Sequence, residues 1–401
     1  MAGNLFFYLY NVVIGHIVGV EGYGVVNALL SAILLFSTPA IVAGAIVAKL
    51  AADLHAANDG HRIRRLADLV DRTAWLTFAG VLVVVVAAHV PIERFFHLSS
   101  SAPVVASGTA LGLTIVATLQ RAVLQGRQRF SAFVISNFID ASGRCVLGAL
   151  GALRFGVAGA ILGVALGLLL TVVFNALAVR LGTPRDSSSS DLRLPWLGKS
   201  ALQIGMTLIA INAMLYYDTI FVRHFFDAQT AGLYGAAALV ARAFYLVVGF
   251  VPVILLPKAA QHAARGERSL RLLLAAGGVI IVVGALAVGA SIVAPVTLVS
   301  AVAGPAFAAA GPYVLPYVCA LVALAGANAV ANYRIGLGSF GHAIPLAVIA
   351  FAQVATVLAR HHSVNDVLLT ILVGDFCALA STLYGINALP AGLRRQSLET
   401  R

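Results

Sequence analysis

Charged residues are scarce in this chain. They make up 10% of its 401 residues, and 61% of the residues are hydrophobic, whereas a soluble domain carries roughly 25% charged residues. Cysteine is scarce as well. Cys145, Cys319 and Cys377 stand far apart in apolar runs, which excludes a disulfide framework and a Cys-x-x-Cys metal site. The composition therefore indicates an integral membrane protein, and we expect neither a metal nor a cofactor.

Catalytic motifs are missing too. The sequence contains no His-Glu-x-x-His, no Gly-x-Ser-x-Gly and no pair of carboxylates at catalytic spacing. Gly198-Lys199-Ser200 resembles the end of a phosphate-binding loop. Arg193, however, occupies the position of the first glycine of that loop, and a Pro-Trp turn precedes it in place of a strand. We therefore do not expect an enzyme.

Long apolar runs account for most of the chain. A membrane-spanning helix needs about 20 mostly apolar residues, and breaks at the charge clusters divide the chain into twelve such spans. Pro295 is expected to end or kink the ninth. The predicted spans are 3–20, 24–48, 73–90, 102–120, 130–150, 156–179, 200–223, 231–256, 270–299, 312–332, 342–360 and 365–389.

The basic residues give the orientation. The formal net charge is +11, but Lys and Arg form no basic stripe, so nucleic acid is excluded as a partner. With the N-terminus in the cytoplasm, 20 of the 26 Lys and Arg residues, Arg121 included, fall in cytoplasmic segments, and four fall in segments on the outer side of the membrane. This follows the positive-inside rule with both termini cytoplasmic. Residues 55–72 are expected to form a charged loop, with an amphipathic interfacial helix as the alternative.

The spans fall into two sets of six. The Ser-rich stretch in the middle predicts an N-terminal lobe at 1–182, a cytoplasmic linker at 183–199 and a C-terminal lobe at 200–401 with a short cytoplasmic tail. Each lobe has a Tyr-Gly turn, Tyr23-Gly24 or Tyr234-Gly235, before a proline-interrupted span that ends in lysine. An even number of spans per lobe makes the repeat parallel, and such lobes usually rock around a central site in a transporter.

A few polar residues interrupt the spans. Asp140 and Arg144 are four apart and can pair, with a neutral structural pair as the simplest interpretation. Arg242 has no opposite charge within one turn, so its partner must come from another helix, water or substrate, and we expect it to face a wet cavity. Arg144 and Arg242 are the only cations within the predicted spans. The other polar residues there are Asp218, Asp375, Asn137, Asn212, Asn328 and Asn332, and the sixth span carries a packing ridge of Gly159, Gly163 and Gly167.

Three stretches carry recognisable motifs. The run 16-HIVGVEGYG-24 is similar to an A-R-x-L-G-x-x-x-Y-G turn, with His16 in place of the arginine. The stretch 124–163 contains a G-x-x-R-F loop and a G-x-x-G-A turn, and the stretch 217–238 has Asp218, Gly232 and Tyr234 at motif positions. In these motifs the chain resembles the polysaccharide transporters, the Wzx-type oligosaccharide flippases of the MOP (multidrug/oligosaccharidyl-lipid/polysaccharide) superfamily. The first helix is shorter than theirs, the last third matches only in its span pattern, and two further helices of some lipid II flippases are absent.

The resemblance implies an all-α integral membrane fold, MATE/MOP-like and V-shaped, with 12 transmembrane helices in two parallel six-helix bundles. It implies a flippase of the bacterial plasma (inner) membrane that moves a polyprenyl-pyrophosphate-linked oligosaccharide to the outer leaflet by alternating access. Membrane lipids, a polysaccharide polymerase and glycosyltransferases would be its partners, and H+ or Na+ its coupling ion. Substrate would bind Arg144, Arg242, Asn137, Asn212, Asn328 and Asn332, and the coupling ion Asp140, Asp218 and Asp375.

Other functions stay open at this point. A cation-coupled multidrug or metabolite exporter of the same superfamily would favour an acidic, aromatic cavity without a central arginine. A lipid II-type flippase is a further alternative. A non-transporting envelope scaffold would be expected to lack the intramembrane charges, and a membrane glycosyltransferase would be expected to have a sizeable outer loop with acidic or His catalytic residues.

Overall fold

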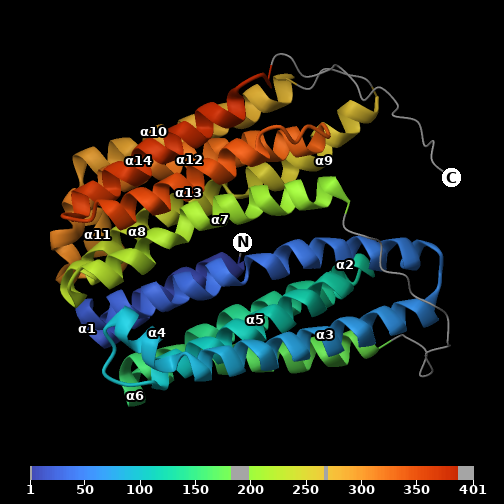
Figure 1. The fold of residues 1–401 in the computed structure, drawn as a ribbon, viewed down its shortest axis with the longest axis horizontal. Coiled ribbons are helices and arrows are strands. Elements are labelled where there is room, and N and C mark those ends of the chain that lie inside the picture. Colours follow the sequence, from blue (N-terminus) through green and yellow to red (C-terminus); the bar gives the residue numbers. More distant parts are fainter. Residues whose placement is uncertain (1, 182–197, 266–269, 387–401) are drawn as a thin grey trace. The chain divides into compact units, whose positions relative to one another are not determined.

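The computed structural model describes residues 2–181, 198–265 and 270–386, and this part of the chain is helical without any strand (Figure 1). The predicted linker, apart from Gly198 and Lys199, and the predicted tail lie outside the described residues. The described chain groups into two compact units. Unit 1 holds 2–181 together with Arg223–Gly235, and unit 2 holds 198–222 together with 236–386.

Unit 1 is built from six helices, together with the end of α7, the start of α8 and the turn between them. The helices are α1 (Ala2–Phe36), α2 (Thr38–Ala56), α3 (Gly60–Ala87), α4 (His89–Phe96), α5 (Ala102–Gly126) and α6 (Phe130–Arg180). The α5 helix packs against α2, α3 and α6 and lies at the centre of the unit.

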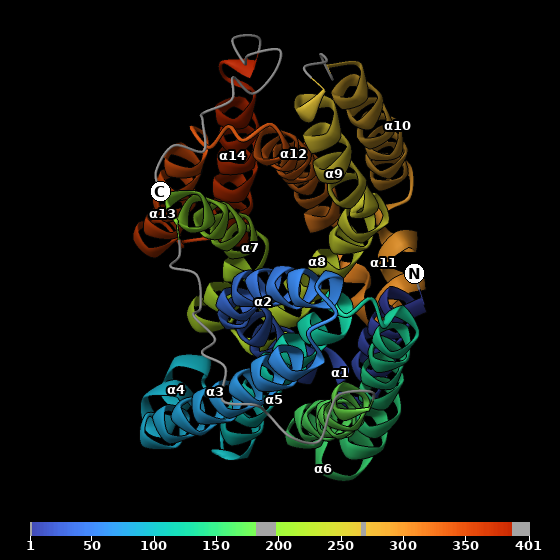
Figure 2. The same ribbon diagram turned by 90° about the vertical axis from the view of Figure 1, so that its right-hand side faces the viewer.

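Unit 2 repeats this plan. Its elements are α7 (Lys199–Phe225), α8 (Ala228–Val248), α9 (Phe250–Ala264), α10 (Leu270–Val293), α11 (Pro295–Ala303), the short 3₁₀ helix η1 (Pro305–Ala310), α12 (Gly311–Gly336), α13 (Ala343–Ala359) and α14 (Val364–Leu383). The α12 helix packs against α9, α10 and α14, as the end view shows (Figure 2).

Two of the long helices are each a hairpin of two spans. The α1 helix breaks at Gly19, whose φ of 71° suits glycine. Tyr23 donates to Asn11 at 3.3 Å. Twelve residues of straight helix would separate these two by about 18 Å, so α1 must fold back at the break.

The α6 helix folds back at Phe155 and Gly156. Its two arms meet glycine to glycine: a Cβ added to Gly151 would lie 2.2 Å from the Gly159 carbonyl oxygen. One added to Gly163 would lie 2.4 Å from Gly148 Cα. The predicted glycine ridge of the sixth span is therefore a close helix-packing surface, as expected.

The described chain has nine helical stretches long and apolar enough to cross a membrane, and α13, with 17 residues, is a shorter apolar helix. With the arms of α1 and α6 counted separately, they account for the predicted twelve spans. The ninth is shorter than predicted, because α10 ends at Val293 and Pro295 begins α11.

The predicted loop at 55–72 is wrong. The α2 helix continues to Ala56 and α3 begins at Gly60, where Asp59 accepts a bond from the Arg62 amide at 2.9 Å and caps the helix. Within this segment Ile63, Leu66 and Val70 are buried. Their helical spacing buries one face of α3, and the charged residues occupy the other.

Equivalent close contacts support the repeat. Gly126 ends α5, and a Cβ added to it would lie 2.3 Å from the carbonyl oxygen of Ala48 on α2. Gly336 ends α12 in the same way, and a Cβ added to it would lie 2.6 Å from the carbonyl oxygen of Leu256 on α9. The two Tyr-Gly turns also meet, since a Cβ on Gly24 would lie 2.6 Å from the Gly232 nitrogen. Both turns therefore lie on the same membrane face, as the parallel repeat predicts.

Candidate functional site

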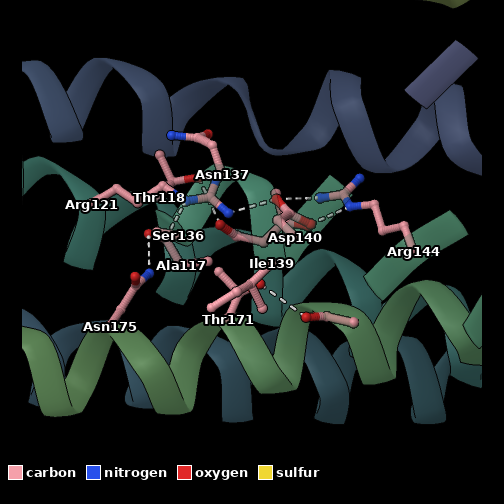
Figure 3. A network of polar contacts seen from close by, with 12 residues as sticks. Ala117, Thr118, Arg121, Ser136, Asn137, Ile139, Asp140, Arg144, Thr171 and Asn175 are labelled. Atoms are coloured by element: carbon pink, nitrogen blue, oxygen red, sulfur yellow. Dashed lines mark hydrogen bonds and ion pairs between the residues drawn. The ribbon is translucent and has the colours of Figure 1, made fainter. Parts of the chain in front are cut away.

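In unit 1, one carboxylate lies between two arginines (Figure 3). Asp140 of α6 accepts a bond of 2.6 Å from Arg121 Nη2 of α5. Arg144, one turn along α6, donates to both Asp140 oxygens through Nε and Nη2. Arg121 Nε also donates to Ser136 Oγ at 3.0 Å. We call Arg121, Asp140 and Arg144 the unit 1 charge cluster.

The predicted Asp140–Arg144 pair is present, but it is not neutral, because Arg121 joins it. The sequence interpretation ended the fourth span at residue 120 and assigned Arg121 to the cytoplasm. The α5 helix instead continues to Gly126, so Arg121 lies on the same helix as the fourth span and reaches Asp140 from it. The helix thus adds Arg121 to Arg144 and Arg242, the two cations expected within the spans.

The hairpin of α6 holds this cluster in place. A Cβ on Gly167 of the second arm would lie 2.7 Å from the Arg144 backbone nitrogen, so the two arms are in backbone contact beside the cluster. Thr171, completely buried, bonds the Gly167 carbonyl at 2.9 Å. The glycines thus position Arg144 through the backbone.

Unit 2 contains a second charged group. Asp218 of α7 is fully buried, and its Oδ1 lies 3.3 Å from Arg242 Nη2 of α8, whose side chain is 12% exposed. Tyr317 of α12 donates to the other Asp218 oxygen. Arg242 Nη2 also donates to the Leu215 carbonyl at 2.9 Å, and its guanidinium lies 5.0 Å from the centre of the Tyr216 ring.

Arg242 thus finds its partner on another helix, which was one of the three possibilities left by the sequence. Asp218 is that partner, while 12% of the Arg242 side chain is exposed, and the expected position of Arg242 at a wet cavity stays a prediction. Nothing in the local sequence shows this pair, because its members come from different helices. Tyr317, on a third helix, was missed for the same reason.

Half-buried polar side chains continue along unit 2. Asn332 Nδ2 donates to Asn328 Oδ1 at 2.8 Å, and Asn328 Nδ2 donates to the Tyr245 hydroxyl at 2.9 Å. We call Tyr216, Arg242, Tyr245, Asn328 and Asn332, all half-buried, the polar strip. The structure therefore connects two predicted asparagines with Tyr245, which is not among the candidate residues that the sequence suggests.

Asn137 and Asn212 do not join these networks through their amide nitrogens. Asn137 donates to the Phe133 carbonyl at 2.8 Å and Asn212 to the Leu208 carbonyl at 3.0 Å, each one turn back along its own helix.

Asp375 of α14 is completely buried and differs from the other two intramembrane carboxylates. Gln353 of α13 donates to its Oδ1 at 3.0 Å. Its Oδ2, like Gln353 Oε1 and the Tyr217 hydroxyl, makes no hydrogen bond within the described part of the chain. Tyr217 interacts electrostatically with both Asp218 and Asp375. Asp375 thus has a carboxylate oxygen available, whereas both oxygens of Asp140 and of Asp218 are engaged.

Comparison with known proteins gives a clear result at the level of fold. No protein-family model and no curated protein sequence matches the chain. Among solved structures, an inward-facing multidrug resistance MATE family transporter of the MOP superfamily superposes with a TM-score of 0.76 at 14% identity, covering 95% of this chain and 94% of that one.

Two further structures share the fold. Lipid II flippase MurJ, in an inward closed conformation, has a TM-score of 0.74 at 11% identity over 96% of this chain and 86% of its own. A MOP superfamily transporter from Pyrococcus furiosus has a TM-score of 0.58 at 15% identity over 97% of this chain and 93% of its own. The multi-pass helical architecture of this chain is that of the MATE transporters and of MurJ.

Proposed function

We propose that this protein is a flippase that moves a polyprenyl-pyrophosphate-linked oligosaccharide from the inner to the outer leaflet of the plasma membrane by alternating access. The fold supports a transporter, since MATE and MurJ structures both superpose on nearly the whole chain. The Wzx-type resemblance of the sequence supports the glycan-lipid substrate. On this proposal both termini lie in the cytoplasm, and no reaction is catalysed.

The polar strip carries the choice of substrate. A glycan brings many hydroxyl groups, and each loses hydrogen bonds to water on leaving it, which is costly unless protein groups replace them. The strip offers amides and phenols, which both donate and accept, within spans that are otherwise apolar. Asn328 and Asn332 are half-buried rather than sealed in the core, so a ligand can exchange with their present bonds.

A cation-coupled multidrug exporter is the second candidate. The MATE fold favours it, and so do the buried carboxylates Asp218 and Asp375 near aromatic Tyr217. A lipid II-type flippase, favoured by the MurJ superposition, would share the pyrophosphate chemistry of the first proposal and differ in the glycan.

The decisive experiment is transport in proteoliposomes. Purified protein would be reconstituted with a fluorescent polyprenyl-pyrophosphate oligosaccharide, and exposure of the glycan in the opposite leaflet would be measured with a membrane-impermeant quencher. We expect exchange well above that of protein-free vesicles. Asn328→Leu should slow it, because the leucine cannot replace the amide bonds. Efflux of a cationic dye without any glycan exchange would instead support the exporter.

We propose Asp375 as the coupling residue. Carboxylates are ligands for H+ and for Na+, and Asp375 has one oxygen without a described hydrogen-bond partner. Asp375→Asn should abolish the dependence of transport on the pH or sodium gradient, while the protein still binds its substrate. If the gradient dependence of Asp375→Asn equals that of the unmodified protein, Asp375 has no coupling role.

A further inference from the structure

We infer that the unit 1 charge cluster is the site that takes the pyrophosphate head of the substrate, and that Asp140 is an internal counter-ion with which this head competes. The identity of the ligand rests on the proposed function. The site itself rests on the charges and contacts of Arg121, Asp140 and Arg144.

The first argument is the charge balance. Two guanidinium groups share one carboxylate, so the cluster has one positive charge in excess. An unbalanced cation within a membrane span is costly and is usually kept for a function. Unit 2 offers no such excess at Arg242, because Asp218 pairs with it one to one and Tyr317 completes the carboxylate's bonds.

The second argument is the hydrogen-bonding capacity. Arg121 and Arg144 bond Asp140 and Ser136 through Nε and Nη2, and the Nη1 group of neither arginine makes one of these bonds. The Arg121 and Arg144 side chains are 16% and 15% exposed, slightly more than the 12% of Arg242. Each guanidinium can still donate to a phosphate, and planar arginine donors suit phosphate oxygens well.

The third argument is depth. Asp140 is ten residues beyond Phe130, where α6 begins. At a rise of 1.5 Å per residue this is about 15 Å along the helix, which is half of a hydrocarbon core about 30 Å thick. Asp140 therefore lies well inside its helix, and Arg121 reaches it from α5 at a position five residues before Gly126. Competition with Asp140 keeps the excess charge partly compensated before the head arrives.

Anion binding by the purified full-length protein tests this inference. Titration calorimetry in detergent would use two probes, inorganic pyrophosphate and polyprenyl pyrophosphate, which separates the anionic group from the lipid. Arg144→Gln leaves the Arg121–Asp140 pair intact and Arg121→Gln leaves Asp140–Arg144 intact, so each removes the excess charge without stranding the carboxylate. We expect either variant to bind both probes at least about tenfold more weakly, the equivalent of about 1.4 kcal/mol.

Asp140→Asn gives the opposite test, because it frees both arginines. We expect this variant to bind both probes more tightly than the unmodified protein does. The double variant Asp140→Asn/Arg144→Gln should not show this tighter binding. The matched control is Asp68→Asn, which removes the carboxylate from the exposed Arg64–Asp68 pair on α3, where Nε and Oδ2 lie 3.1 Å apart. That variant should bind both probes as the unmodified protein does.

The outcomes separate this inference from the proposed function. If Arg121→Gln and Arg144→Gln bind polyprenyl pyrophosphate with unchanged affinity while the unmodified protein moves the glycan lipid, the inference is overturned and the function stands. If both variants lose pyrophosphate binding but no glycan lipid is moved by the unmodified protein, the anion site stands and the proposed function fails. Weaker binding of inorganic pyrophosphate alone would overturn the assignment to the lipid head.

Discussion

At the scale of single residues, the three intramembrane carboxylates differ in what surrounds them. Asp140 lies between two arginines, Asp218 faces one arginine and one tyrosine, and Asp375 has one amide partner. We therefore assign a different role to each aspartate: Asp140 competes with anions, Asp218 is a structural counter-ion, and Asp375 is the coupling group.

The Asp218–Arg242 pair predicts a stability effect. Arg242→Gln leaves the carboxylate of a completely buried aspartate without its cation, which should destabilise the protein by about 3 kcal/mol. The double variant Asp218→Asn/Arg242→Gln removes both charges, so it should lose clearly less stability than Arg242→Gln does. Thermal unfolding in detergent would measure both. If the double variant is no more stable than Arg242→Gln, the pair is not the reason for the loss.

His342 predicts a dependence of stability on pH. It lies between α12 and α13 with 1% of its surface exposed, 3.4 Å from the Thr207 hydroxyl. Burial, and then the charge of Arg334, lower the pKa of His342 from 6.5 to about 4. The unfolded chain therefore binds this proton at a higher pH than the folded one, so stability is greatest above pH 6.5 and falls as the pH drops toward 4.

Replacement of His342 tests this sign. His342→Gln should flatten the loss of unfolding temperature between pH 6.5 and pH 4, and the same change at the exposed His55 should leave it as it is. An equal loss in His342→Gln and in the unmodified protein would show that other groups cause the dependence.

At the scale of elements, glycines decide how closely the helices approach. A Cβ on Gly159 would lie 1.9 Å from the Gly151 carbonyl oxygen, so Gly159→Ala must force the arms of α6 apart. We expect a loss of about 1–3 kcal/mol, as for other overpacked sites, together with weaker pyrophosphate binding because Arg144 is positioned by the same contact surface. Thermal unfolding and titration calorimetry would measure the two effects.

Gly80 of α3 supplies the control for that experiment. An added Cβ there meets nothing within 4 Å, and alanine is a better helix former than glycine. Gly80→Ala should therefore be no less stable than the unmodified protein. Equal behaviour of Gly80→Ala and Gly159→Ala would contradict the packing role of the α6 glycines.

The last helix of each repeat ends in the same way. Arg127 donates to the Val179 carbonyl at 2.5 Å, near the end of α6, and Arg334 donates to the Thr382 carbonyl at 3.0 Å, near the end of α14. The terminal carbonyls of a helix lack partners within it and carry partial negative charge, which arginine satisfies. The repeat thus extends to the way its helices are terminated.

At the scale of the whole molecule, the repeat and the span count predict the topology. Reporters fused after Arg185 and after Arg401 should both report the cytoplasm, because twelve spans bring the chain back to its starting side. A reporter fused after Gln229, next to the Tyr-Gly turns, should report the outer side. A periplasmic signal at Arg185 or at Arg401 would contradict the assignment of both termini to the cytoplasm.

The amino-acid sequence by itself determined the class, the number of spans and the parallel repeat. Apolar length, the position of basic residues and the matching turns at Tyr23 and Tyr234 are local signals, and they need no knowledge of which helices are neighbours. The i, i+4 pair of Asp140 and Arg144 was within reach for the same reason, since both residues lie on one face of one helix.

Only the tertiary structure decided which charges are balanced. Arg121 with Asp140, Asp218 with Arg242 and Gln353 with Asp375 each join two helices, and sequence spacing says nothing about such contacts. The extension of α5 beyond residue 120 was also decided there, because bonds to Asp140 and Ser136 stabilise a charged residue that hydropathy would leave outside the membrane. Helix packing therefore gives Arg242 its carboxylate partner and leaves the excess positive charge in the unit 1 charge cluster.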